Sequence, residues 1–347
     1  MKKILVASSA LVAVAFAGQA QASEKISLSV SGYMEQWIGG ASQDSSFESA
    51  GAFQSDTEVH FKGSTTLDNG IEVGAAIEFE AEGEADNNTD EQYLFINGGF
   101  GQVKLGQEDG AAADMTINAP NVGPAGVNDG DMPNFVTLNQ TPDNAWDDGD
   151  ANKLTYYTPV LGGFRAGVSY TDDDTSEADN DENVNNEGDS VVSAGVEYNG
   201  DFDAVSISIA AVGESKGEGE WYHVGGTVGF GNFTVGASYG LREAEFDKGE
   251  NAVTTEDDDM GVDFGISYAM DAATVSATYM YAEMEDDDDD TTTTGHDEFN
   301  GVDLGLAYTL GAGVTWKSSV FWFDYKGADA ANDNDGFGAV TGLVLSF

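Results

Sequence analysis

The chain of 347 residues contains no cysteine, so disulfide frameworks, thiolate metal sites and cysteine nucleophiles are excluded. It has only three histidines, His60, His223 and His296, which are too scattered in sequence for a His-rich metal site. Its 12 Lys and Arg stand against 63 Asp and Glu, which gives a formal net charge of −51. Because proteins bind a phosphate backbone through basic side chains, we expect no nucleic-acid partner.

The motifs of the common enzyme classes are also absent. The sequence has no glycine-rich phosphate loop followed by Lys-Ser/Thr, no Gly-x-Ser-x-Gly elbow and no paired-histidine metal motif. Glu58 and His60 imitate an acid–base pair, but their i, i+2 spacing on one strand face is more typical of two wall residues of an aqueous lumen. We therefore expect a protein that is not an enzyme and that requires no cofactor.

Long apolar runs are scarce, and the clearest one stands at the start of the chain. Ile4–Ala17 follows the cationic residues Met1–Lys3 and precedes the small-residue site Ala20–Ala22. This is the three-part layout of a secretory signal, and the run is shorter than the ~20 residues of a membrane-spanning helix. We therefore expect residues 1–22 to be a cleaved signal peptide and residues 23–347 to be the exported mature protein.

Period-two alternation is abundant in the rest of the chain. In residues 71–80 the apolar side chains fall on one face of a strand and the glutamates on the other. Residues 233–239, 262–268 and 302–308 repeat the pattern. Alternation alone fits either a β-sandwich with its apolar face inward or a membrane barrel with its apolar face outward.

The segments between the strands distinguish these two architectures. Short turns such as 68–70, 199–201 and 311–313 alternate along the chain with long acidic segments such as 172–189 and 285–298. An outer-membrane barrel has short turns at one end, long loops at the other and an even number of strands. We count sixteen alternating segments, which begin near Lys25, Ser55, Ile71, Gln92, Gln102, Asn152, Phe164, Ser190, Phe202, Trp221, Asn232, Asp258, Ala272, Glu298, Val314 and Gly336. The predicted fold class is therefore all-β, a transmembrane antiparallel β-barrel of 16 strands.

Two further features favour a membrane barrel. Aromatic side chains near the strand ends are predicted to lie in interface girdles, namely Tyr33, Tyr170, Tyr198, Tyr239, Tyr268 and Tyr308. The chain ends in the alternating strand 341–347, which closes on Phe347. Together with the export signal, this end resembles the terminal signal of outer-membrane proteins. The resemblance implies the barrel assembly machinery as a partner and the cell outer membrane as the location.

The segments that carry a family resemblance lie in the first half of the chain. They are Phe61–Ser64, Leu67–Gly70, Ile77–Glu80, Gly99–Gly106, Leu154–Pro159 and Gly162–Phe164. In this order they resemble the general, non-specific porins of Gram-negative bacteria, particularly the alphaproteobacterial type. The resemblance implies a 16-stranded barrel, usually a homotrimer, that passes small hydrophilic solutes through a water-filled pore.

The longest interval without alternation runs from Gln107 to Asn152. In the porin family the third loop folds into the lumen and narrows it, so the resemblance implies that residues 107–152 form the pore-constriction loop. An outward-facing lid is the alternative, because long loops serve several purposes. The acidic residues of this interval are Glu108, Asp109, Asp114, Asp129, Asp131, Asp143, Asp147, Asp148 and Asp150.

The basic residues of the family pattern are not conserved at two places in this chain. Family members commonly have Arg where this chain has Gln107, and often a base where it has Asp56–Glu58, so the family's arginine cluster does not carry over. Turning the apolar faces toward lipid predicts a pore wall of Asp56, Glu58, His60, Lys62, Glu78, Glu80, Lys104, Gln107, Lys153 and Arg165. Glu72, Glu197, Asp263 and Asp303 point the same way. Eight acids against four bases on this face predict a cation-preferring pore.

Runs of acids in the long segments suggest a second role. Carboxylates at this density suit Ca²⁺ or Mg²⁺, which would bridge the segments to one another or to lipopolysaccharide. The candidate metal ligands are Asp172, Asp173, Asp174, Asp257, Asp258 and Asp259. The alternative is that the runs are solvated, self-repelling loops that bind no metal.

Three functions stay open on the sequence alone. The first is a homotrimeric, cation-preferring porin for passive diffusion, surrounded by outer-membrane lipid. The second is a structural outer-membrane protein whose acidic surface loops bind divalent cations. The third is a secreted, soluble β-protein that binds Ca²⁺ or carbohydrate. Conductance after reconstitution separates the first two, and solubility without detergent identifies the third.

Overall fold

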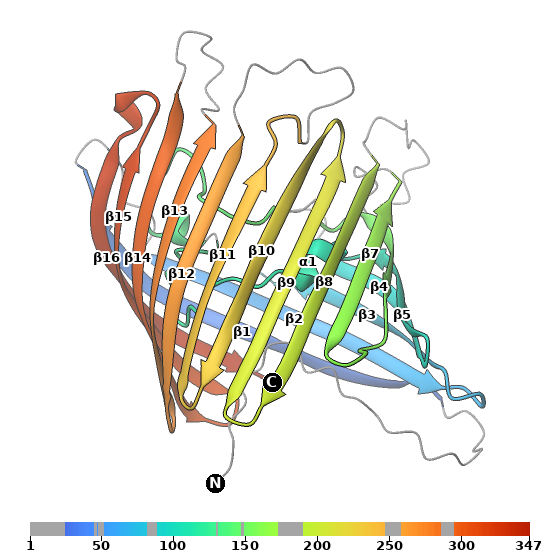
Figure 1. The fold of residues 1–347 in the computed structure, drawn as a ribbon. Helices are drawn as coiled ribbons and strands as arrows, with labels where there is room; N and C mark the ends of the chain where they lie inside the picture. The colour runs from blue at the N-terminus through green and yellow to red at the C-terminus, as the bar shows by residue number, and fades with distance from the viewer. Residues whose placement is uncertain are drawn as a thin grey trace.

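The computed structural model describes residues 25–44, 47, 52–81, 89–129, 131–146, 149–172, 190–246, 258–285 and 295–347; the predicted signal peptide lies outside these residues. Within them, sixteen antiparallel strands form one closed barrel (Figure 1). The strands are β1 Ser27–Ser42, β2 Phe53–Thr66, β3 Glu72–Glu80, β4 Thr89–Gly98, β5 Gly101–Gln107, β6 Asn152–Tyr157, β7 Phe164–Thr171, β8 Val191–Phe202, β9 Val205–Lys216, β10 Gly219–Phe230, β11 Phe233–Arg242, β12 Asp259–Met270, β13 Ala273–Glu285, β14 His296–Gly311, β15 Val314–Lys326 and β16 Asn334–Ser346.

The predicted strands are confirmed, since each observed strand begins within three residues of its predicted start. One turn lies further along the chain than predicted. β8 continues to Phe202, so the turn into β9 is made at Asp203 rather than at residues 199–201. Asp203 has a φ of 51°, in the left-handed region that Asp tolerates better than most residues.

Closure of the barrel joins the two ends of the described chain. β1 pairs with β2 on one side and with β16 on the other, so each described strand has two neighbours. Gly32 of β1 and Phe347 exchange two backbone hydrogen bonds of 3.0 Å. The alternating strand at the carboxyl end therefore closes the barrel, because its pairing with β1 leaves neither of these two strands as an unpaired sheet edge.

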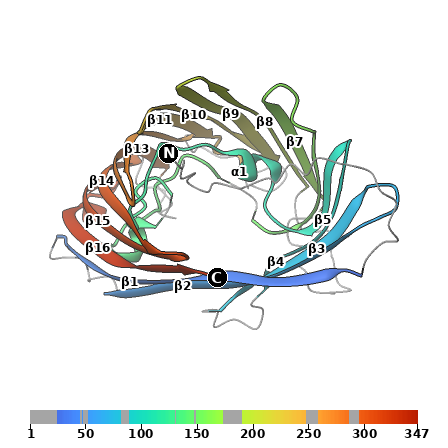
Figure 2. The same cartoon turned by 90° about the horizontal axis from the view of Figure 1, so that it is seen from below.

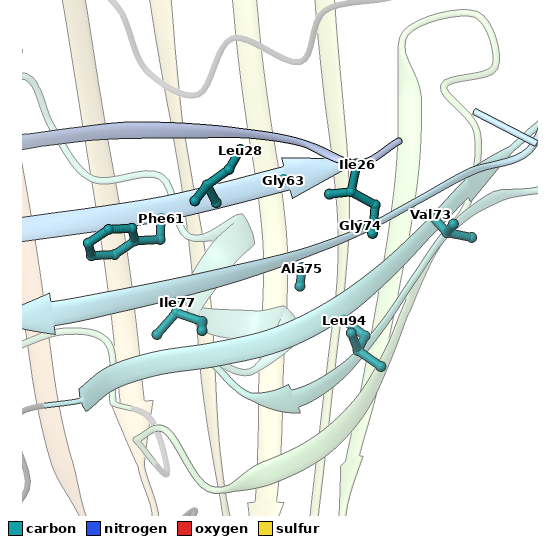
Figure 3. A pocket seen from close by; sticks show the side chains of 9 residues that line it. All are labelled: Ile26, Leu28, Phe61, Gly63, Val73, Gly74, Ala75, Ile77 and Leu94. Atoms are coloured by element: carbon teal, nitrogen blue, oxygen red, sulfur yellow. The ribbon is translucent and has the colours of Figure 1, made fainter. Parts of the chain in front are cut away.

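The outer face of the barrel is apolar. On β14, Leu304 is 55% exposed whereas Asp303 and Gly305 on either side of it are buried, and other strands alternate in the same way. An apolar groove of about 280 Å³ lies on β1–β4 (Figure 3), lined by Ile26, Leu28, Phe61, Gly63, Val73, Gly74, Ala75, Ile77 and Leu94. Among the described residues, no helix is long and apolar enough to cross a membrane.

Residues 108–151, which we call the lumen loop, connect β5 to β6, and those of them that the structure describes lie inside the ring of strands (Figure 2). The interval was predicted to lack strand alternation, and its described residues contain two short helices instead of a strand. These are α1 (Ala111–Met115), which packs on β7, β8 and β9, and the 3₁₀ helix η1 (Met132–Asn134).

Two apolar clusters lie between the lumen loop and the inner wall. In one, Ala111, Ala112 and Met115 of α1 pack with Tyr157, Ala210, Val212, Trp221 and Phe246. In the other, Ala125, Val127, Met132, Phe135 and Val136 pack with Met280, Ala282, Met284, Phe299, Phe321, Phe323, Tyr325 and Val340. Burying one such large side chain contributes roughly 1.5–3 kcal/mol, so the two clusters hold the loop inside the barrel at two separate places.

Candidate functional site

Four inward-facing serines hold the backbone of the lumen loop to the wall. Each accepts a hydrogen bond from a loop N–H group, at 2.8 to 3.1 Å. The pairs are Ala111 with Ser169, Ala112 with Ser193, Val122 with Ser276, and Ala125 with Ser319. A serine is small enough for the loop to approach, and its hydroxyl satisfies an amide that is cut off from water.

Two wall carboxylates that were predicted to face water lie beneath the loop instead. Asp263 accepts hydrogen bonds from the Ala119 N–H group at 2.9 Å and from the side chains of Asn128 and Ser238 at 2.6 Å. Asp303 is buried as well. These acids point inward as predicted, but they receive donors and are covered, because the loop occupies the lumen next to them.

Buried charges fix the two ends of the loop. Lys153, predicted as a pore-wall residue, is buried and donates from Nζ to the carbonyl oxygens of Glu108 and Gly149, the latter at 2.6 Å. The Glu108 carboxylate forms an ion pair with Lys104. Burial raises the pKa of Glu108, and the nearby Lys104 charge opposes that rise. Gln107, another predicted wall residue, is also buried at this point.

Two further loop acids are engaged within the protein. Asp143 accepts a hydrogen bond from the next residue's N–H group at 2.7 Å, so it caps a turn of the loop. Asp114 accepts one from the Tyr157 hydroxyl at 2.5 Å and lies 3.4 Å from Lys104 Nζ. Both carboxylates therefore have partners within the protein and are not solvated by lumen water alone.

The other described loop acids meet acids of the wall. Carboxylate oxygens of Asp109 and Asp150 lie within 4.8 Å of each other and of Glu91 on β4. Asp129 and Asp131 are exposed, and Asp131 is close enough to Asp56 on β2 for the two charges to repel. Asp147 and Asp148, from the same predicted set, lie outside the described residues.

β2 and β3 carry a patch of acids on their inner face. We call Asp56, Glu58, Glu78 and Glu80, with His60 among them, the acidic wall patch. The register pairs Glu58 with Glu80 and His60 with Glu78 across the two strands. His60 Nε2 lies 2.7 Å from Glu58 Oε2 and 3.3 Å from Glu78 Oε2. The structure thus brings together five residues that were predicted separately as pore wall.

Tyr33 belongs beside this patch, so its predicted position in an interface girdle is wrong. Its hydroxyl donates to Glu58 Oε1 at 2.5 Å and lies 3.2 Å from Asp56 Oδ2. Its ring meets the His60 ring edge-on, with 6.1 Å between centroids. The alternation pattern alone does not separate an aromatic residue at a membrane interface from one that faces the lumen near a strand's end.

The bases gather nearer the end of the barrel with the short turns. Lys62, Lys104 and Arg165 line a cavity of about 550 Å³. Arg165 pairs with Glu197 at 2.8 Å, and Lys62 Nζ lies 5.3 Å from the centroid of the Phe95 ring. The sequence did not predict that these bases meet; the one available signal is that each lies within a few residues of a short turn.

The family of the chain follows from its match to a family model. The model of the Gram-negative porin family matches residues 7–328. The chain is a Gram-negative porin. It is therefore a channel protein of the outer membrane, in keeping with the apolar outer face and the charged interior described above. No curated protein matches the chain.

Solved structures of two porins and of another outer-membrane protein share the fold at low sequence identity. An anion-selective porin from Comamonas acidovorans is 17% identical with a TM-score of 0.66, over 93% of this chain and 100% of that one. A mutant of the Rhodopseudomonas blastica porin is 18% identical with a TM-score of 0.60, over 92% and 100%. A trimer form of OmpT from Vibrio cholerae is 11% identical with a TM-score of 0.63, over 93% and 100%.

The predicted surface metal ligands of this porin are only partly described. Asp172 accepts a hydrogen bond from Tyr170 at 2.8 Å, and Asp258 accepts one from a backbone N–H group at 3.3 Å. Asp259 is buried and pairs with Arg242. Asp173, Asp174 and Asp257 lie outside the described residues. Calcium or magnesium binding by these loops stays a prediction.

Proposed function

We propose that this porin forms a cation-preferring pore for passive diffusion of small hydrophilic solutes and ions, and that it assembles as a homotrimer. The lumen loop is bonded to β7, β8, β13 and β15, and it also reaches the start of β2, where Gln54 donates to the Asn134 carbonyl oxygen at 2.9 Å. The rest of β2 and β3 form the wall across the lumen from α1 (Figure 2). Solutes then pass between the loop and the acidic wall patch, so the loop acts as the constriction.

The observation that carries this proposal is that acids stand on both sides of that route. The wall contributes Asp56, Glu58, Glu78 and Glu80 from adjacent strands. The loop contributes Asp129 and Asp131, which are exposed. Rings of carboxylates raise the local concentration of cations and repel anions, and the effect weakens as salt shortens the screening length to ~8 Å near 0.15 M.

The porin fold by itself does not decide selectivity, since the Comamonas acidovorans neighbour is anion-selective. The preference must therefore follow from this chain's own side chains. The basic cavity lined by Lys62, Lys104 and Arg165 is the opposing influence. Two of its bases are already paired with carboxylates, Lys104 with Glu108 and Arg165 with Glu197, which reduces their pull on anions.

The test is the reversal potential of the reconstituted porin across a KCl gradient. We expect cation preference at low salt that declines as the salt concentration rises. The variant Asp56→Asn/Glu58→Gln/Glu78→Gln/Glu80→Gln should lose most of that preference, because four negative charges leave the route while the side-chain shapes are kept.

A matched control removes four acids elsewhere. Asp68, Asp203 and Asp271 are exposed in the short turns, and Asp201 is exposed near the end of β8 beside one of these turns, away from the acidic wall patch. Their combined change to Asn removes the same charge and should leave the reversal potential near the wild-type value. Anion preference of the wild type, or equal behaviour of the two quadruple variants, would refute the proposal. A barrel that conducts nothing would instead favour a structural outer-membrane protein with metal-binding loops.

The homotrimer is proposed from a neighbour of the same fold, the trimer form of OmpT. Light scattering in detergent, corrected for bound detergent, should give a mass of three chains. A mass of one chain under conditions that keep the barrel folded would contradict it. Contacts with lipopolysaccharide and with the barrel assembly machinery are expected on the same family grounds.

A further inference from the structure

Three potential metal ligands of the acidic wall patch converge on one point. His60 and Glu58 come from β2, and Glu78 comes from the facing position on β3. Both carboxylates approach the same imidazole atom, Nε2, at 2.7 and 3.3 Å. The three ligand atoms all lie within 4.8 Å of one another.

Hydrogen bonding alone does not account for this convergence. Nε2 carries at most one proton, and that proton points along one direction, so it serves one of the two carboxylates well and the other poorly. A cation between the three atoms would satisfy Glu58, His60 and Glu78 together. Donor atoms bound to one metal at about 2.0–2.2 Å sit roughly 3 Å apart, which is the spacing observed between His60 and the two carboxylates.

The donor set decides which cation fits. One imidazole nitrogen with two carboxylates is typical of first-row transition ions such as Zn²⁺, whereas Ca²⁺ and Mg²⁺ prefer sites made wholly of oxygen. Three protein ligands leave at least one position for water. This mixed set distinguishes the site from an ordinary group of surface acids, which would hold hard cations loosely.

Tyr33 orients two of the three potential ligands, Glu58 and His60, without being a ligand itself. Its hydroxyl donates to Glu58 Oε1 at 2.5 Å, which turns the other oxygen, Oε2, toward His60. Its ring also packs edge-on against the His60 ring. Partners of this kind fix ligand orientation and commonly contribute 10–100-fold to metal affinity.

The site is open to ions in the lumen. The side chains of His60, Glu58 and Glu78 are 27%, 14% and 21% exposed, so they are partly enclosed and still reachable. Glu80 and Asp56 stand next to them and form a second group of carboxylates with Glu58. Their negative charge favours the approach of any divalent cation.

We propose that Glu58, His60 and Glu78 bind a divalent first-row transition ion, with Zn²⁺ as the probe, on the lumen wall of this porin. Metal bound there adds positive charge and bulk to the proposed solute route. Zn²⁺ therefore lowers conductance and weakens cation preference. This effect rests on the proposed pore function, whereas metal binding itself does not.

Binding is tested by calorimetric titration of detergent-solubilised porin with Zn²⁺ in a background of millimolar Ca²⁺, which occupies the hard-oxygen sites. His60→Asn and Glu78→Gln should each lower the affinity of one site per chain at least tenfold. Glu72→Gln is the matched control, because Glu72 lies on the same inner face of β3 and bonds Asn97 at 2.9 Å instead. Wild-type affinity in both ligand variants would overturn the proposal.

Two further measurements keep the test decisive. X-ray absorption at the zinc edge of the wild-type protein should show nitrogen and oxygen ligands with one imidazole, and a spectrum without imidazole would contradict the site even if a variant failed to fold. In planar bilayers, micromolar Zn²⁺ should reduce the conductance of the wild type and of Glu72→Gln but not that of His60→Asn. Loss of Zn²⁺ binding in the variants of a barrel that never conducts would support the site and refute the pore.

Discussion

Replacing Gly240 or Gly225 by alanine is expected to push the lumen loop off the barrel wall and to change the conductance of the porin. A Cβ atom at Gly240 would stand 1.7 Å from the carbonyl oxygen of Asn144, and one at Gly225 would stand 1.8 Å from that of Ile117. Both obstacles are loop backbone, which cannot rotate away as a side chain can. The loop itself must move by more than an ångström.

The strain of one added methyl group in a packed site costs about 1–3 kcal/mol. The cost falls on the contact between loop and wall, because the strands stay hydrogen-bonded to their neighbours. Each single variant should therefore fold as a barrel, with a wider spread of single-channel conductance and more current noise than the wild type. The double variant Gly225→Ala/Gly240→Ala should show the largest change, since the two contacts hold different parts of the loop.

Gly40→Ala is the matched control for these variants. Gly40 is a strand glycine of β1 whose added Cβ would meet nothing within 4 Å. Its conductance histogram should match that of the wild type. The view that the loop is seated against glycines of the wall would be wrong if the Gly225 and Gly240 variants also matched it.

The barrel could be predicted from the sequence because lipid imposes one rule on every strand. Outward positions must be apolar, as at Leu304, and inward positions are small or polar, as at Asp303 and Gly305. That rule fixes the strands and their number, with errors of a few residues where a turn has no strong signal. The turn at Asp203 is such a case, since Asn199–Asp201 carries an equally good turn composition.

The path of the lumen loop could not be predicted in the same way. Its attachment depends on inward residues such as Ser193, Ser276 and Gly240, and alternation treats all of these alike as small or polar. Only the three-dimensional structure shows that these residues lie opposite an amide or carbonyl group of the loop backbone. For the same reason Asp263 and Lys153 were predicted to face open water, although the loop covers them.

The contact between His60 and Glu78 could not be predicted either, because it depends on the register between β2 and β3. The sequence showed Glu58 and His60 two residues apart, which suggested a plain wall pair. Glu78 reaches the same nitrogen because β3 runs back along β2 from a short turn. The sequence can therefore place single residues on one strand face while their contacts across strands stay unknown.

Lys104→Met should be the most destabilising of the single substitutions in the lumen. The side chain of Glu108 is fully buried, and Lys104 is its ion-pair partner. Removing one member of a buried pair leaves the other charge uncompensated, which typically costs about 3–5 kcal/mol. We expect a fall of that size in the free energy of unfolding at pH 8, measured by tryptophan fluorescence during guanidinium unfolding in detergent.

Lys62→Met is the matched control, because Lys62 is exposed and rests on the Phe95 ring rather than on a buried carboxylate. It should change the free energy of unfolding by about 1 kcal/mol or less, as surface charges usually do. A second variant, Lys104→Met/Glu108→Gln, removes the stranded charge and should recover most of the loss at pH 8. Lys104 Nζ also lies 4.8 Å from the centroid of the Tyr93 ring and 5.8 Å from that of the Tyr157 ring. A double variant no more stable than Lys104→Met would show that the loss of these ring contacts matters more than the uncompensated charge.

The pH dependence separates these two causes. Burial raises the pKa of Glu108 above that of an unfolded glutamate, and loss of Lys104 removes the charge that opposes this rise. A group with a raised folded-state pKa favours folding at low pH and loses that contribution as the pH rises through its folded-state value. The loss of unfolding free energy in Lys104→Met, relative to the wild type, should therefore become smaller as the pH falls toward the ordinary glutamate pKa, ~4.3.

The Lys104→Met/Glu108→Gln variant is the control for this pH dependence. Its unfolding free energy should not rise toward that of the wild type as the pH falls, because it has no carboxylate at position 108. An equal deficit for Lys104→Met at pH 8 and near pH 4 would mean that Glu108 carries no buried charge.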